Sequence, residues 1–219
     1  STFPPGHIYT EKTGFVKYYQ PEWEDASKAV EEVDYKAIRK SLTKAVKKRL
    51  MADVPFGVLL SGGLDSSLTS SIACRLLEGT GQKIHSFSIG LDADSPDTKA
   101  ARKVAEFIGT EHHEIHFTIE QGIEILEKLI WHLETYDVTS IRASTPMYFL
   151  SKAITEQGIK MVLSGEGADE VFGGYLYFRN APSAAEFQQG PIDGVQKLFT
   201  AVLLRAVKST MGEGLLARV

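Results

Sequence analysis

One stretch, residues 56–67, constrains the fold of this chain more than any other. Phe-Gly-Val-Leu-Leu at 56–60 leads directly into Ser-Gly-Gly-Leu-Asp-Ser-Ser at 61–67. A short uninterrupted apolar run is typical of a strand buried on both faces of a parallel sheet. The glycine pair predicts a tight turn, and the residues after it are typical of a helix start, where free N–H groups and the helix dipole attract anions. The stretch therefore predicts a strand, a phosphate-binding loop and a helix.

Two common nucleotide-binding motifs are absent from the chain. It has neither G-x-x-x-x-G-K-[ST], with its phosphate-binding lysine, nor G-x-G-x-x-G. The pattern Ser-Gly-Gly-Leu-Asp-Ser at 61–66 instead resembles the PP-loop of the ATP pyrophosphatases, which cleave ATP to AMP and pyrophosphate while adenylating a substrate. The alternative is a glycine-rich turn between a strand and a helix that binds no ligand.

Strand-like and helix-like segments alternate along most of the chain. Apolar spacing predicts a helix from Asp34 to Leu50 before the loop and, after it, further helices that alternate with strands. The expected strands are 84–90, 113–118 and 160–164, and the expected helices are 68–77, one that ends at Gly109, 119–133 and one that follows Pro146. This alternation is typical of βαβ units. We expect an α/β fold, a three-layer sandwich with a parallel sheet of about five strands.

The first 33 residues differ from the rest of the chain. Ile8-Tyr9 and residues 15–19 flank a polar turn and predict a β-hairpin, with proline-containing linker segments on both sides. We therefore divide the chain into a hairpin or linker, residues 1–33, and one domain, residues 34–219. A basic run at 44–49 is either a phosphate contact or a solvated helix face.

Composition and charge exclude several classes of protein. A net charge of −4 gives no support for a nucleic-acid binder. No apolar run approaches the roughly 18 residues of a membrane span, and the N-terminus has no signal-peptide pattern. The single cysteine, Cys74, excludes an intrachain disulfide, and its place on an apolar helix face favours a buried structural thiol over a nucleophile. We expect a cytoplasmic protein without nucleic-acid or membrane partners.

A second group of polar residues follows the strand at 160–164. Ser164, Gly165, Glu166, Asp169 and Glu170 combine carboxylates with glycines in a short turn. Asp65 also follows a strand, so Asp65 and Asp169 are candidates to share a Mg²⁺ ion with ATP phosphates. The alternative is a solvated acidic turn.

Two further sets of residues are candidates for ligand binding. Residues 88–90 end a predicted strand beside the loop, where they either line an adenine pocket or simply pack. His112, His113 and His116 lack the spacing of a metal site, because 112 and 113 point to opposite faces of a strand and no cysteine joins them. We therefore expect structural histidines and no zinc.

Four segments in order extend the resemblance along nearly the whole chain. Residues 58–67, 134–139, 141–147 and 162–175 resemble the synthetase domain of glutamine-hydrolysing asparagine synthetases of the class B type. β-Lactam synthetases share the loop and the fold, which is that of the adenine nucleotide alpha-hydrolase-like PP-loop proteins. They are less similar in the stretches 134–147 and 175–182.

The resemblance implies a reaction with ATP, Mg²⁺, aspartate and ammonia. The aspartate β-carboxylate attacks the α-phosphate of ATP, pyrophosphate leaves, and ammonia displaces AMP to give asparagine. Glu166 is implied as the base that takes a proton from ammonia, and Arg142 as a residue that positions aspartate or closes the ammonia path, the alternative being a structural arginine. Asp65 and Asp169 are implied as Mg²⁺ ligands. The implied nucleotide and pyrophosphate contacts are Leu60, Ser61, Gly62, Gly63, Asp65, Ser66, Ser67, Ile89, Ser164 and Gly165.

The chain departs from the family pattern at both ends. From the resemblance we expect this chain to lack the glutaminase domain with its cysteine nucleophile, before residue 3, and the family helices that would follow residue 219. Gly194 stands where the family has a phosphate-contacting lysine, and apolar or charged residues replace family residues at Val202, Val207, Glu213 and Leu216. We therefore expect weak, ammonia-dependent activity. The alternatives are an ATP-binding scaffold without turnover, natural or engineered, and a related ligase that amidates another carboxylate.

Overall fold

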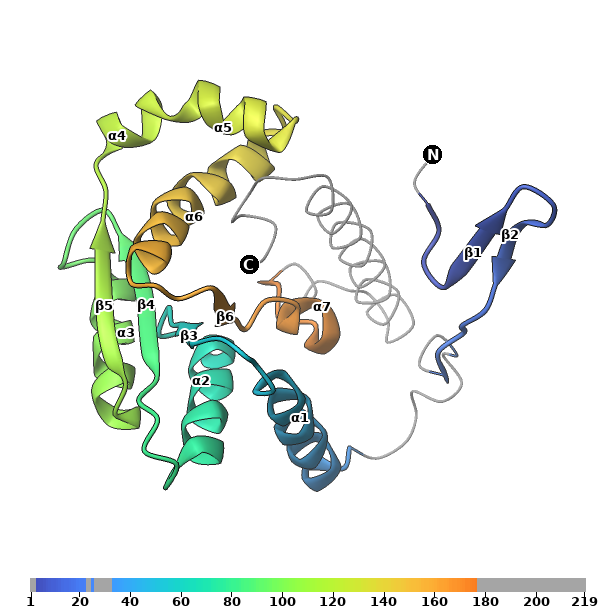
Figure 1. Ribbon diagram of the computed structural model, residues 1–219, viewed down its shortest axis with the longest axis horizontal. Coiled ribbons are helices and arrows are strands. Elements are labelled where there is room, and N and C mark those ends of the chain that lie inside the picture. The colour runs from blue at the N-terminus through green and yellow to red at the C-terminus, as the bar shows by residue number, and fades with distance from the viewer. Residues whose placement is uncertain (1–2, 23–24, 26–32, 177–219) are drawn as a thin grey trace. The chain divides into compact units, whose positions relative to one another are not determined.

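The computed structural model describes residues 3–22, 25 and 33–176 (Figure 1). The expectations for Gly194, Val202, Val207, Glu213 and Leu216 lie outside the described residues. The chain divides into two compact units. The hairpin unit comprises Ser1–Tyr35 and Glu166–Glu213, and the sheet unit comprises Lys36–Gly165 and Gly214–Val219.

The sheet unit is built on a parallel sheet in the order β5-β4-β3-β6. Its strands are β3 (Phe56–Leu59), β4 (His85–Gly90), β5 (Glu111–His116) and β6 (Met161–Leu163). The apolar run at 56–60 predicts a central strand, and β3 does pair with both β4 and β6. The predicted α/β fold with a parallel sheet is therefore confirmed, with four strands among the described residues where about five are predicted.

Helices cover both faces of this sheet, so the predicted three layers are present (Figure 1). On one face Val58 packs with Val46 and Ala73, and Leu60 packs with residues of α3. On the other face Phe87 packs with Leu150 of α6. The helices of the unit are α1 (Tyr35–Arg49), α2 (Leu64–Leu77), α3 (Pro96–Ile108), α4 (Ile119–Glu124), α5 (Leu126–Leu133) and α6 (Val138–Glu156). None of the helices in the described ranges is long and apolar enough to cross a membrane.

Local sequence signals explain where α3 begins and ends. The Ser95 side chain accepts a hydrogen bond from the Thr98 N–H, and Pro96 occupies the first turn, where a missing N–H costs nothing. Gly109 ends the helix in the left-handed conformation, with φ of 74°. The sequence predicts this end correctly.

Several predicted boundaries differ from those of the structure. The single helix expected over 119–133 is two helices, α4 and α5, which meet at Ile125. The helix expected to follow Pro146 begins earlier, at Val138, where the Asp137 side chain accepts from the Ser140 N–H, and it contains the proline. The third strand also begins two residues before the predicted 113. The cap at Asp137 starts α6 early enough to carry it through the proline.

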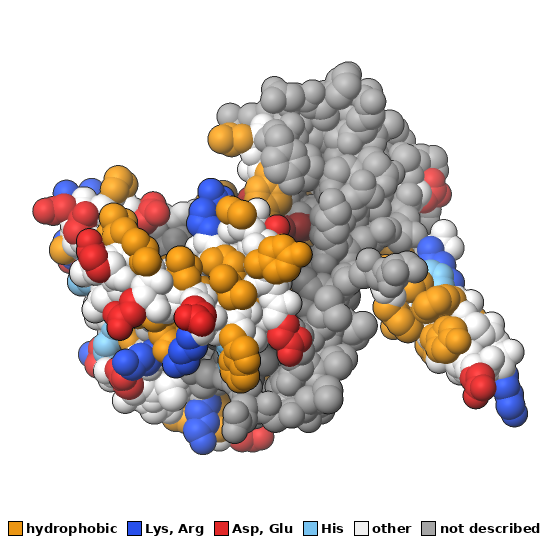
Figure 2. All heavy atoms as spheres, turned by 90° about the horizontal axis from the view of Figure 1, so that it is seen from above, with side chains coloured by type: hydrophobic (Ala, Val, Ile, Leu, Met, Phe, Trp, Pro, Cys, Tyr) orange, Lys and Arg blue, Asp and Glu red, His pale blue; other side chains and the backbone are white. Residues whose placement is uncertain are grey.

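The hairpin unit contains the predicted β-hairpin. β1 (His7–Thr10) pairs antiparallel with β2 (Gly14–Lys17), with Tyr9 opposite Phe15. The rings of Tyr9 and Phe15 lie 5.0 Å apart, a cross-strand aromatic contact that stabilises the pair. Most apolar side chains of the hairpin are exposed, and Figure 2 shows them gathered on its surface. The unit also contains the short helix α7 (Ala168–Phe172).

Candidate functional site

The loop at 61–67 is fixed at its base by Leu60. The Leu60 side chain is 1% exposed and packs against Ala101 and Ala105 of α3. Its N–H donates to the Phe87 carbonyl of the neighbouring strand at 2.8 Å. The main chain therefore leaves the sheet at a defined point, directly before the glycine pair.

Hydroxyl groups hold the loop in one conformation. The Ser61 N–H donates to Ser66 Oγ at 3.2 Å, and the two hydroxyl oxygens lie 2.9 Å apart. The Ser66 hydroxyl also reaches the Gly63 carbonyl at 3.3 Å. These contacts close Ser61 onto the first turn of α2.

Gly62 shows why this loop requires glycine. Its φ is +80°, and a Cβ atom here would lie 2.6 Å from the Ala101 nitrogen in the backbone of α3. Both the conformation and the close approach exclude other residues. Helix α3 therefore packs directly on the loop.

The start of α2 presents unused N–H groups. Gly63 occupies the N-cap and gives no side-chain hydrogen bond, and the first bond of the helix runs from the Ser67 N–H to the Gly63 carbonyl at 3.1 Å. The preceding N–H groups have no intrahelical acceptor. In addition, Ser67 Oγ is buried without a hydrogen-bond partner among the described residues. These donors and the positive end of the helix dipole suit a polyanion.

The loop after β6 lies against the start of α2 at Gly165. A Cβ atom on Gly165 would lie 2.8 Å from the carbonyl carbon of Asp65 and from the nitrogen of Ser66. Ser164 precedes it and is exposed. The structure thus brings the segments 61–67 and 164–165, which are far apart in the sequence, into direct backbone contact.

Ile89 and its neighbours lie at the end of β4. The half-buried Ile89 side chain packs with the Phe87 cluster on the α6 face of the sheet. Ser88 faces the opposite side, where its hydroxyl lies 3.1 Å from His112 Nε2. Both side chains contribute to packing, and the half-buried Ile89 lies next to the carboxyl end of β4.

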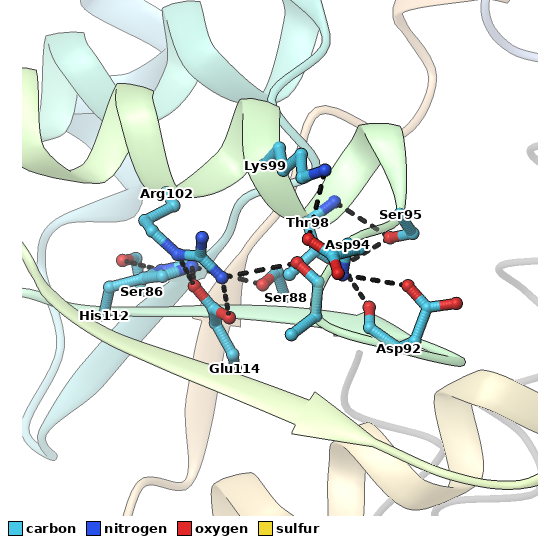
Figure 3. Close-up of polar contacts among 11 residues, drawn as sticks. Ser86, Ser88, Asp92, Asp94, Ser95, Thr98, Lys99, Arg102, His112 and Glu114 are labelled. Atoms are coloured by element: carbon cyan, nitrogen blue, oxygen red, sulfur yellow. Dashed lines mark hydrogen bonds and ion pairs between the residues drawn. The ribbon is translucent and has the colours of Figure 1, made fainter.

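A polar network that the sequence analysis missed fixes α3 to the sheet (Figure 3). Arg102 of α3 donates from Nε and Nη2 to the two carboxylate oxygens of Glu114 in β5, at 2.6 and 2.7 Å. This paired hydrogen bond lowers the pKa of the Glu114 carboxyl and keeps it ionised. Because α3 also packs on Gly62, the pair helps to position the loop. A helix arginine and a strand glutamate give no local sequence signal of their pairing.

His112 is a structural histidine, as predicted. Its two ring nitrogens lie 2.8 Å from Ser86 Oγ and 3.1 Å from Ser88 Oγ (Figure 3). Burial lowers the pKa of His112, so the ring is neutral near pH 7. Cys74 also fits its predicted structural role, because it packs on the Val58 core and burial raises the pKa of its thiol.

Arg142 is not brought together with the loop by any hydrogen bond or ion pair among the described residues. It is exposed in the first half of α6. Its carbonyl lies four residues before Pro146, which has no N–H to donate to it. The structure therefore places Arg142 on a helix surface.

The predicted acidic residues Glu166 and Asp169 belong to the hairpin unit. Their neighbour Tyr175 donates from its hydroxyl to Glu170 Oε1 at 2.6 Å. This hydrogen bond, burial, and the negative charges of Glu170, Asp169 and Glu166 raise the pKa of Tyr175 well above its usual range. The carboxylates are therefore gathered around one phenol.

The sheet and its loop place this chain among the α/β proteins with a parallel sheet. An α/β protein with a parallel sheet binds ligands at the carboxyl ends of its strands, where the segments 61–67 and 164–165 lie. A profile of the asparagine synthase family matches residues 37–219. The chain belongs to the asparagine synthase family.

Curated relatives are similar over the whole of this chain. It is 52% identical over 250 residues to glutamine-hydrolysing asparagine synthetase 1 of Saccharomyces cerevisiae, with 100% of this chain and 44% of that protein covered. It is 56% identical over 234 residues to a probable glutamine-hydrolysing asparagine synthetase of Schizosaccharomyces pombe, with 99% and 42% covered. The chain therefore spans less than half the length of these relatives.

Solved structures show weaker similarity. The NH3-dependent NAD synthetase of Campylobacter jejuni gives a TM-score of 0.45 at 17% identity, covering 66% of this chain and 62% of that one. The U34-tRNA thiolase of Methanococcus maripaludis gives 0.47 at 18% identity, covering 81% and 60%.

Proposed function

We propose that this chain carries out the ATP-dependent part of an amidation of aspartate to asparagine. In this reaction the β-carboxylate of aspartate attacks the α-phosphate of ATP, pyrophosphate leaves, and ammonia displaces AMP from the β-aspartyl-AMP. Family membership over residues 37–219 supports the reaction class. The observation that carries the proposal is the backbone contact of Gly165 with Asp65 and Ser66, which joins two segments proposed to bind nucleotide.

The loop residues fit a pyrophosphate group. The uncapped N–H groups at the start of α2 and the unpartnered hydroxyl of Ser67 are donors for phosphate oxygens. Ser61, Gly62, Gly63, Ser66 and Ser67 would surround the pyrophosphate, and Leu60, Ile89, Ser164 and Gly165 would lie toward the nucleoside. The hydrogen bonds between Ser61 and Ser66 hold the loop, and a loop held in place lowers the entropy cost of binding.

The Asp65 carboxylate lies in the first turn of α2 and fits Mg²⁺, which prefers oxygen ligands. When bound, Mg²⁺ neutralises the charge that develops on the phosphates. Asp169 as a second ligand, Glu166 as the base for ammonia and Arg142 as a positioning residue are proposed from their sequence motifs.

Binding of ATP and release of pyrophosphate test the proposal in two steps. We expect calorimetry to show one Mg·ATP per chain, and a pyrophosphate assay to require both aspartate and ATP. Ammonia should then give asparagine. Turnover of another carboxylate in place of aspartate would favour the related-ligase alternative, and binding without any pyrophosphate release would favour the nucleotide-binding scaffold.

A pair of matched variants makes the binding test specific. Asp65 and Asp97 both lie in the first turn of a helix, in α2 and α3 respectively. We expect Asp65→Asn to weaken Mg·ATP binding by about 10-fold or more, equivalent to about 1.4 kcal/mol. Asp97→Asn should leave it unchanged. Equal affinities for both variants would contradict the site.

A further inference from the structure

Two imidazoles and a carboxylate meet at the edge of the sheet where the strands begin. His85 Nδ1 lies 2.9 Å from His113 Nε2, and Glu111 Oε1 lies 3.8 Å from the first nitrogen and 4.0 Å from the second. All three ligand atoms lie within 4.8 Å of one another. No other such group of three occurs in the described part of the chain.

The strand register places these side chains on one face of the sheet. His85 is paired with Glu111, and Phe87 is paired with His113, so residues 85, 111 and 113 point the same way. The rings of His113 and Phe87 stack with centroids 4.9 Å apart, which fixes the orientation of the histidine. The backbone itself is fixed here, because the Glu111 N–H donates to the Ile84 carbonyl at 2.9 Å. The three groups therefore come from a rigid support.

The hydrogen bond between the imidazoles leaves the carboxylate outside hydrogen-bond distance of either nitrogen. A tetrahedral Zn²⁺ ion with ligands at about 2.0–2.1 Å separates its ligand atoms by about 3.3 Å. The observed separations of 2.9, 3.8 and 4.0 Å bracket this value. Small side-chain rotations would therefore bring all three atoms to a central ion.

We propose that His85, Glu111 and His113 bind one divalent transition-metal ion, with water in the remaining position. Two imidazoles and one carboxylate form a known zinc ligand set, whereas Mg²⁺ and Ca²⁺ prefer oxygen ligands alone. The side chains are 32%, 47% and 23% exposed in the order His85, Glu111, His113, so solvent gives the ion a path and supplies the water.

The position in the fold indicates what the ion does. Among the described strands β5 lies at one edge of the sheet, and the three ligands connect it to β4. The loop at 61–67 follows the end of β3, whereas these residues lie where β4 and β5 begin. The ion therefore stabilises the edge of the sheet and does not take part in ATP chemistry. The inference does not depend on the proposed function.

Titration of the full chain with metal ions tests this site. Chelator-treated protein without nucleotide is titrated with Zn²⁺ by calorimetry and with Co²⁺ by visible absorption. We expect one ion per chain, ligand-field bands of low-symmetry Co²⁺, and no competition from excess Mg²⁺. We also expect Zn²⁺ to raise the midpoint of thermal unfolding, since the ion binds the folded state.

Variants assign the ion to these ligands. His113→Ala and His85→Ala should weaken Zn²⁺ binding by at least about 100-fold, beyond the 10–100-fold typical of outer-shell partners. His132→Ala, at an exposed position on α5, should leave it unchanged. Circular dichroism checks folding, and Glu111→Gln is the milder replacement if an alanine variant unfolds. No saturable binding by the parent chain, or equal binding by the parent and a folded ligand variant, would overturn the proposal.

Discussion

Gly165 is the residue whose replacement tests the candidate site most directly. A Cβ atom there would meet backbone atoms of Asp65 and Ser66 at 2.8 Å, and backbone cannot move aside as a flexible side chain can. We expect Gly165→Ala to separate the loop after β6 from the start of α2. Mg·ATP affinity, measured by calorimetry, should fall by about 10-fold or more, equivalent to about 1.4 kcal/mol.

Gly122→Ala is the matched control for this variant. A Cβ atom at Gly122 in α4 would make ordinary contacts, 3.4 Å from the Phe117 ring and 3.5 Å from Thr145 Cγ2. Alanine also favours a helix over glycine. Unchanged ATP affinity is therefore expected for Gly122→Ala. If Gly165→Ala bound ATP as tightly as this control, the contact at Gly165 would have no role in binding.

At the residue scale the sequence predicts local features better than distant pairs. The glycine and hydroxyl residues of 61–67 are informative because a tight turn and a helix start need those residue types in that order. The Arg102–Glu114 pair joins a helix to a strand, so its partners follow from the fold and not from spacing. The same holds for His85 and His113, which are 28 residues apart in the sequence and meet only because β4 and β5 pair.

Among the elements, α6 gives a prediction about stability. Pro146 lies inside this helix and cannot donate a hydrogen bond to the Arg142 carbonyl. Pro146→Ala restores that donor, and alanine suits a helix interior. The replacement also raises the conformational entropy of the unfolded chain, which partly offsets the gain in stability. We expect a net gain of about 1–2 kcal/mol in the free energy of unfolding, measured with urea and circular dichroism.

Pro96→Ala is the control with the opposite sign. Pro96 occupies the first turn of α3, where proline is favoured and no intrahelical bond is lost. Replacement there should lower the free energy of unfolding by about 0.4–1 kcal/mol, because it only adds freedom to the unfolded chain. A loss of stability in Pro146→Ala as well would show that the proline contributes through packing.

The same helix shows why element types are predicted better than their boundaries. Alternating strands and helices establish the α/β class, because parallel strands require crossover connections. A proline in a sequence predicts the start of a helix. In α6, however, the Asp137 cap and the burial of Leu150 and Ile154 outweigh the free-energy cost of a proline inside the helix. Similarly, the break at Ile125 carries no glycine or proline signal, so one helix is expected where two are found.

At the scale of the whole molecule, the division into two units allows the ATP proposal to be tested by finding which segments ATP protects from hydrogen exchange. The residues proposed to surround the nucleotide, 60–67 and 164–165 with Ile89, all belong to the sheet unit, whereas the β1–β2 hairpin belongs to the other unit. Ligand binding suppresses local opening of the segments that contact the ligand. We expect hydrogen exchange, followed by mass spectrometry, to slow in peptides that cover 60–67 and 164–165 when Mg·ATP is added.

The hairpin provides an internal control in the same experiment, because the proposed site contains none of residues 7–17. At 100 times the dissociation constant, ATP contributes about 2.7 kcal/mol to the stability of the state that binds it, so protected amides in the loop should exchange roughly 100-fold more slowly. Asp65→Asn should reduce this slowing from roughly 100-fold to roughly 10-fold at the same ATP concentration, because a 10-fold loss of affinity lowers the stabilisation to about 1.4 kcal/mol. Equal slowing in the hairpin and in the loop would contradict a nucleotide site formed by residues 60–67, 164–165 and Ile89, because ATP would then slow exchange only by suppressing global unfolding.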